Sequence, residues 1–152
     1  MAAHVTIEMN ETVLAQAYEE LKLSNPPSFT LNHSGKYADI SKDQKVRGMY
    51  HGDTNHVDIT SQGDSNEREG LYVLTKHIRF TVLHELRHAW QREHWTPEQK
   101  TLGHQGNYAQ RIEEIDANEW ARYASQKYRG LVTIKRRQVG TSGFSRLSTV
   151  TR

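Results

Sequence analysis

The chain has 152 residues, the size of one domain, and only 35% of them are hydrophobic or aromatic. With a mean hydropathy of −0.84, its buried core must be modest. The absence of cysteine excludes disulfides, thiolate metal sites and cysteine nucleophiles. No run of residues approaches the roughly 18 apolar residues that cross a bilayer, and the first ten residues lack a signal-peptide pattern. We therefore expect a cytoplasmic protein that neither enters a membrane nor is exported.

The net charge of +2 is unevenly distributed along the chain. Residues 1–119 carry 12 basic and 18 acidic side chains, whereas residues 120–152 carry 8 basic and no acidic ones. A basic end of this kind can bind nucleic acid, here through Lys135-Arg136-Arg137, although most such ends are solvated termini. We expect one domain over residues 1–130 and a basic strand or tail over residues 131–152.

The first half of the chain predicts strands and one helix. Polar and apolar residues alternate over 4–9, which is typical of a half-buried strand. Asn10 is expected to cap a helix with apolar residues at helical spacing, which Ser24-Asn25-Pro26-Pro27 ends. Further strands are expected at 29–31, 46–50 and 56–60, and the turn-like residues 51–55 join the last two.

The second half predicts two helices. A long helix from Leu71 to about His94 is indicated by an apolar stripe at Leu71, Leu74, Ile78, Val82, Leu86 and Ala89. Thr96-Pro97 ends it, and a loop with Gly103 and Gly106 follows. A second helix is expected from Asn107 to Tyr128, and a short strand near 131–134. The expected buried residues of the second helix include Ile112, Ile115, Trp120 and Tyr123. These elements together indicate an α+β fold.

The long helix contains an H-E-x-x-H motif, His84-Glu85-Leu86-Arg87-His88. Residues four apart lie on one helical face, so both imidazoles can bind one Zn²⁺ ion, and Glu85 can take a proton from a water molecule beside it. The alternative is a helix whose histidines face solvent or make ordinary hydrogen bonds. The motif lies in the clearest helix of the sequence, so we favour the metal site. Because ligating imidazoles must be neutral, zinc occupancy should fall below about pH 6.5.

A catalytic zinc site needs a third protein ligand. His94 follows His88 by six residues, as in the longer H-E-x-x-H-x-x-G-x-x-H motif, but Gln91 occupies the place of the glycine that would break the helix. In a continuous helix His94 would lie about 240° around the axis from His88. We therefore do not expect His94 to be a ligand.

The second helix contains Glu113-Glu114-Ile115-Asp116-Ala117-Asn118-Glu119-Trp120-Ala121. This segment resembles the glutamate helix of the gluzincin metallopeptidases, in particular the ImmA/IrrE family and small phage-encoded relatives. The resemblance implies Glu114 as the third ligand, Ala117 as the small residue between the helices and Asn118 as a residue that orients a ligand. Asp116 and Glu113 remain alternative ligands. In organisation the resemblance covers about residues 46–121.

The same resemblance implies a zincin-like α+β fold, with a small mixed or antiparallel sheet, an active-site helix and a following glutamate helix. In that fold the strand at 56–60 lies at the sheet edge and pairs with substrate, although an interior strand fits the sequence equally well. Tyr108 is the first choice for the donor that stabilises the oxyanion, with Tyr123, Arg122 and His104 as alternatives.

The function expected from these features is zinc-dependent hydrolysis of a peptide bond. The enzyme would be a metalloendopeptidase with a His84, His88 and Glu114 zinc site and Glu85 as general base. Its substrate would be a peptide or protein inside a bacterial or phage-infected cell, as the resemblance implies. Two other functions are compatible with the sequence: a phage structural or interaction protein that keeps the metal site without catalysis, and nucleic-acid binding through the basic tail.

Overall fold

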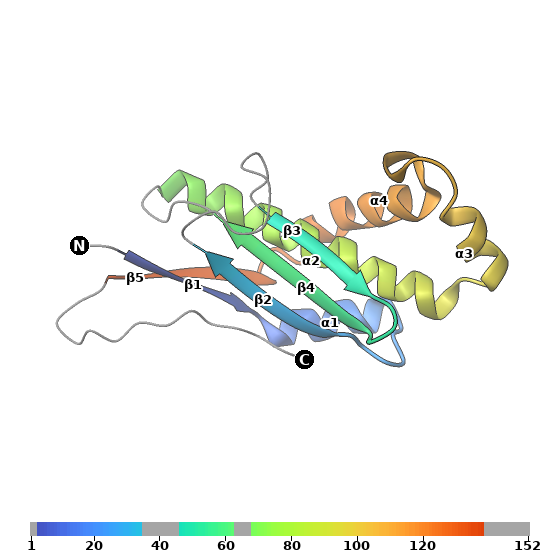
Figure 1. Cartoon of the computed structure of the whole chain (residues 1–152). Coiled ribbons are helices and arrows are strands. Elements are labelled where there is room, and N and C mark those ends of the chain that lie inside the picture. The colour runs from blue at the N-terminus through green and yellow to red at the C-terminus, as the bar shows by residue number, and fades with distance from the viewer. Residues whose placement is uncertain (1–2, 35–45, 63–67, 139–152) are drawn as a thin grey trace.

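The computed structural model describes residues 3–34, 46–62 and 68–138. Helices and strands are mixed along the chain, and the expected α+β class is confirmed. In chain order the elements are β1 (Ala3–Met9), α1 (Glu11–Glu20), β2 (Ser28–Ser34), β3 (Val46–His51), β4 (His56–Gln62), α2 (Arg68–His94), α3 (Pro97–Gly103), the 3-10 turn η1 (Tyr108–Gln110), α4 (Ile112–Lys127) and β5 (Val132–Gln138) (Figure 1).

Three strands form a mixed sheet in the order β2-β4-β3. β2 is parallel to β4, and β3 is antiparallel to it. The tight turn after His51 joins β3 to β4 as an antiparallel pair. β2 pairs with the opposite side of β4. Of the two positions that the sequence left open for the strand before the long helix, the interior one is therefore confirmed, and the edge position implied by the resemblance is not observed. Among the described strands, β3 occupies the edge beside α2.

Helix α2 lies across one face of this sheet (Figure 1). The predicted stripe is confirmed where side chains are described, because Leu74, Ile78, Val82, Leu86 and Ala89 are all buried. The first four of them belong to one core cluster with inward-facing residues of β2 and β4, namely Phe29, Leu31, Val57 and Ile59. Burial of this apolar surface holds the motif-bearing helix in position against the sheet.

Helix α1 adds to the same core. Its predicted N-cap is confirmed, since the Asn10 side chain accepts hydrogen bonds from the backbone amides of Thr12 and Val13. The helix ends at Glu20, four residues before the expected stop. Leu14 and Ala17 are buried, and the imidazole of His94 lies 3.2 Å from the carbonyl oxygens just after the helix.

Helix α4 packs against α2 through small residues. Ala117, Ala121 and Ala124 are fully buried on the same face as Glu114. The expected burial of three bulky residues is wrong, because 58% of Ile112, 43% of Ile115 and 53% of Tyr123 is exposed, and Trp120 is only partly buried. Alanines allow the axes of α2 and α4 to come close. Helix α4 therefore presents its alanines to α2, and its isoleucines lie on the outward side.

Helix α3 was not predicted. The Thr96-Pro97 pair ends α2 as expected, but it also begins α3: the Thr96 hydroxyl accepts from the Gln99 amide, and the Gln99 side chain accepts from the Thr96 amide. Gly103 is the last residue of α3 and packs against Trp95. A Cβ atom at position 103 would lie 2.6 Å from the indole. This short helix contacts α4.

The end of the described chain forms a separate antiparallel ribbon. β5 pairs with β1 from Met9 opposite Val132 to Ala3 opposite Gln138, which confirms the expected strand. Part of the basic segment is thus held against the domain, while residues 139–152 of the expected tail lie outside the described residues. Within the described ranges no helix combines the length and apolar character needed to cross a membrane.

Gly48 permits the close contact between β3 and α2. A Cβ atom at this position would lie 2.5 Å from Thr81 Cγ2 and 3.0 Å from Glu85 Cγ. We predict that Gly48→Ala lowers the free energy of unfolding by about 1–3 kcal/mol, the usual cost of overpacking, as measured by urea unfolding. Gly52→Ala is the matched control, because its nearest atom would be Arg92 Cδ at 3.5 Å. Equal effects of the two substitutions would contradict this explanation.

Candidate metal centre

Two imidazoles from consecutive turns of α2 meet at one point. The Nε2 atoms of His84 and His88 lie 3.2 Å apart, and the two rings are nearly perpendicular, at 84°. Both atoms face α4. The four-residue spacing of the motif therefore produces the convergence that it predicts.

Glu114 on α4 brings a carboxylate to the same point. Its Oε1 lies 3.0 Å from His84 Nε2, and its Oε2 lies 3.1 Å from His88 Nε2. Ligands at 2.0–2.1 Å in a tetrahedral zinc site are about 3.3 Å from one another, close to all three of these separations. Two neutral imidazoles and one carboxylate also form a donor set that zinc prefers. The three side chains therefore fit a divalent cation.

The two alternative ligands on α4 are engaged elsewhere. The Asp116 carboxylate accepts hydrogen bonds from Arg87 Nε at 2.9 Å and Nη2 at 3.1 Å. The Glu113 carboxylate lies 2.6 Å from His104 Nδ1 and 3.9 Å from Arg111 Nη1. Of the three acids considered from sequence, Glu114 is the one that reaches both imidazoles.

Glu85 lies beside this triangle. Its Oε2 is 3.7 Å from His84 Nε2, so the carboxylate is near the two imidazoles but farther away than that of Glu114. Burial raises the pKa of Glu85, and the charges of His88 and His84 and a hydrogen bond from the Tyr50 backbone amide oppose the rise. A carboxylate with a raised pKa next to a cation site is suited to accept and return a proton.

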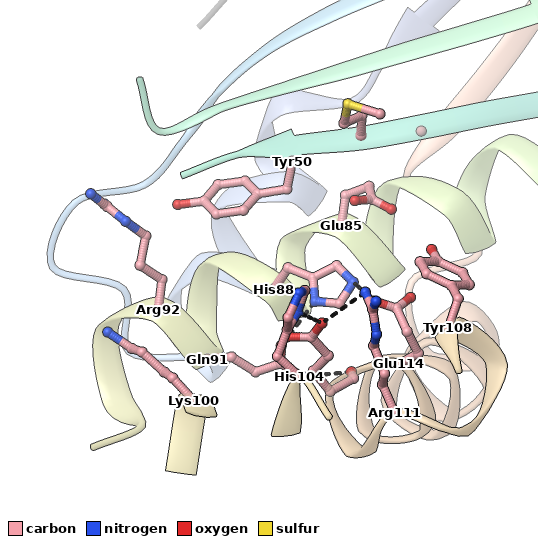
Figure 2. Close-up of a pocket in the computed structure, with 13 residues that line it drawn as sticks. Tyr50, Glu85, His88, Gln91, Arg92, Lys100, His104, Tyr108, Arg111 and Glu114 are labelled. Carbon is pink, nitrogen blue, oxygen red and sulfur yellow. Dashed lines mark hydrogen bonds and ion pairs between the residues drawn. The ribbon is translucent and has the colours of Figure 1, made fainter. Parts of the chain in front are cut away.

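Tyr108 reaches the site because the predicted second helix is broken. In one continuous helix, Tyr108 and Glu114 would be about 240° apart around the axis. Instead η1 ends at Gln110, and Arg111 adopts an extended backbone before α4 begins. The Tyr108 ring points toward Glu114 in Figure 2. Partial burial of the hydroxyl and its interaction with the Glu114 carboxylate raise the pKa of Tyr108, although 64% of the residue as a whole is exposed.

The other candidate donors differ in location. Tyr123 faces outward on α4 beside Lys127, and Arg122 is exposed on the same helix. Neither lines the cavity beside the site, whereas His104 does. His94 binds the carbonyl oxygens after α1, as expected of a residue that is not a ligand.

A cavity of about 500 Å³ opens over Glu85, His88 and Glu114. These residues and Tyr108 gather at one end of the cavity in Figure 2, and Arg92 and Lys100 lie at the other end. The edge strand β3 forms one wall. The remaining lining residues come from β3, α2, α3 and the segment before and within α4, namely Gly48, Met49, Tyr50, Gln91, His104, Arg111 and Glu113.

Without a metal ion, the imidazole of His88 holds an additional proton at neutral pH. Burial opposes protonation of His88, but its hydrogen bond to Glu114, the charge of Glu85 and a bond to Gln91 outweigh burial and raise the pKa of His88 to about 9. Burial also opposes ionisation of Glu114, yet its bonds to both imidazoles hold its pKa well below the usual range. A cation that bound here would have to displace a proton from His88 up to about pH 9, above the pH 6.5 expected from an ordinary imidazole.

Sequence reasoning missed one residue that contacts the site. The resemblance implied that Asn118 orients a ligand, but no described hydrogen bond joins Asn118 to either imidazole. Instead His88 Nδ1 lies 2.8 Å from Gln91 Oε1. The signal was available, because Gln91 follows His88 by three residues and so lies on the same helical face.

Comparisons with protein-family models, with curated proteins and with solved structures find no match for this chain. The resemblance to the gluzincins therefore stays a prediction, and it is carried by the H-E-x-x-H motif and the glutamate helix.

The shifted pKa values predict how pH affects the metal-free protein. The raised pKa of His88 adds stability below pH 6.5, and this contribution is lost as pH rises to about 9. We expect the free energy of unfolding, measured in urea with a chelator present, to fall over this range by at most about 1.4 kcal/mol per pH unit. His88→Gln should remove the slope. A slope that persists in the variant would show that other groups cause it.

Proposed function

We propose that the protein is a zinc-dependent metalloendopeptidase of zincin-like architecture. The observation that carries the proposal is the convergence of His84, His88 and Glu114, whose ligand atoms lie 3.0–3.2 Å from one another. Glu85, which is 6% exposed beside them, supports a hydrolase over a purely structural metal site, because a structural site has no use for an additional acid that lines an open cavity without being a ligand.

Bound zinc would supply Lewis acidity, which acidifies a water molecule and polarises a substrate carbonyl. Glu85 accepts a proton from the attacking water as the C–O bond forms. It then returns the proton to the amide nitrogen as the C–N bond breaks, so that a carboxylate and an amine leave. The Tyr108 hydroxyl donates a hydrogen bond to the carbonyl oxygen as that oxygen becomes negative.

The edge strand β3 gives the cavity a surface for an extended peptide. Gly48, Met49 and Tyr50 line the cavity, and among the described strands nothing pairs with the outer side of β3. A peptide laid along this edge can form main-chain hydrogen bonds irrespective of its sequence. This role was expected for β4, and the proposal transfers it to β3.

The decisive test separates metal binding from catalysis. We expect wild type and Glu85→Gln both to bind one zinc ion per chain, measured by metal analysis after dialysis, whereas His84→Ala loses the ion. Glu85→Gln should lower the rate of casein cleavage, measured as new amino termini, by about 10²–10⁴-fold, because it cannot accept a proton.

Two outcomes would contradict the proposal. Wild type that binds zinc but cleaves no polypeptide would favour the structural or interaction protein. Cleavage that survives in Glu85→Gln would show that a contaminating peptidase or another base performs the reaction.

Tyr108→Phe tests the oxyanion donor. We predict that kcat for the same substrate falls by about 10²–10³-fold with little change in KM, because the hydrogen bond strengthens only as charge develops on the oxygen. Tyr123→Phe is the matched control, since this residue lies on the outward face of α4. If both variants keep wild-type kcat, Tyr108 does not have this role.

A further inference from the structure

Gln91 is a buried polar residue that the proposed reaction does not use. It lies one turn after His88 on α2, faces α4 and is only 4% exposed. Its amide nitrogen donates to the Glu113 carbonyl at 2.8 Å and to Asp116 Oδ2 at 2.9 Å. Its amide oxygen lies 2.8 Å from His88 Nδ1. Every polar atom of this side chain therefore has a partner.

These contacts define the proton position on His88. The amide nitrogen of Gln91 is held by two acceptors, so the amide oxygen must face the imidazole. An amide oxygen can only accept a hydrogen bond, so Nδ1 of His88 carries the hydrogen. In a neutral imidazole the lone pair then belongs to Nε2, the atom that points at Glu114 and His84.

Gln91 is itself held from both helices. Asp116, its partner on α4, receives two hydrogen bonds from Arg87 on α2, whose guanidinium lies 3.6 Å from the Trp90 ring centre. His84 differs from His88, because its Nδ1 is buried without a hydrogen-bond partner in the part of the chain that the structure describes. Among the described residues, His88 is therefore the one imidazole of the pair with a hydrogen bond at Nδ1, whereas Nε2 of both rings contacts Glu114.

We propose that Gln91 is a positioning residue of the metal site. Its amide oxygen holds His88 in the tautomer and ring orientation that present the Nε2 lone pair to a divalent cation, and Asp116 and Arg87 keep the amide from turning. The inference rests on the proposed metal site but not on peptide hydrolysis, because its measure is metal affinity.

The test compares zinc affinity in variants, measured by competition with a chromophoric chelator at constant pH. In Gln91→Met the side chain has nearly the same shape, but it has no amide oxygen to accept the hydrogen bond from His88 Nδ1. Asp116 keeps its hydrogen bonds from Arg87 in this variant. We expect the zinc Kd to rise by about 10–100-fold, the usual effect of losing the residue that orients a ligand.

A compensating pair distinguishes orientation from packing. In Gln91→Glu/Asp116→Asn the new carboxylate can accept from His88, and the new amide at position 116 can donate to that carboxylate. We expect this pair to regain part of the zinc affinity lost in Gln91→Met, since one carboxylate oxygen still faces the Glu113 carbonyl. Gln91→Glu alone should regain none, because its carboxylate faces that of Asp116 as well.

Glu93→Ala is the matched control for loss of stability. Glu93 is on the same helix and accepts backbone hydrogen bonds from Ser24 and Asn25, but it does not touch the imidazoles. The zinc Kd of Glu93→Ala should match that of wild type. A Kd for Gln91→Met within twofold of wild type, or an equal loss in Glu93→Ala, would overturn the role of Gln91. Wild type that binds no zinc would instead overturn the metal site itself, and this inference with it.

Discussion

The structure depends on a negative charge placed inside a helix interface. Glu114 is 5% exposed, and a carboxylate removed from water is costly unless a positive partner compensates it. The partners are imidazoles on α2, at 3.0 and 3.1 Å. They can compensate either by holding a proton or by sharing a cation with the carboxylate. The same interaction thus joins the two helices and defines the chemistry at their interface.

Close approach of the helices makes this interaction possible. Three buried alanines on α4 allow it to approach α2, and Gly48 allows β3 to approach the same helix from the other side. Side chains of ordinary size at these positions would separate the layers and withdraw Glu114 or crowd Glu85. Small residues are therefore as necessary to this cluster as the two imidazoles and the Glu114 carboxylate, although they carry no chemistry themselves.

The sequence predicted well what depends on local pattern and poorly what depends on packing. The H-E-x-x-H helix has a regular apolar stripe, so its extent and the convergence of His84 and His88 followed from helical geometry. The buried face of α4 did not follow from the sequence. Hydrophobicity favoured Ile112 and Ile115 for burial, whereas the close approach of the two helices required alanines. The interior position of β4 depends on its pairing with β2 and β3, which no single segment of the chain reveals.

The terminal ribbon has a consequence for how the chain acquires this shape. Met9 lies opposite Val132, and the Asn10 amide donates to the Leu131 carbonyl, so the ribbon closes a loop that contains the sheet and all the described helices. During synthesis β1 emerges first and must wait for β5, which is made only after α4. Such distant pairing forms slowly. β1 therefore lacks its partner strand until α4, which carries Glu114, has been made, so the ribbon closes only after every described helix is present.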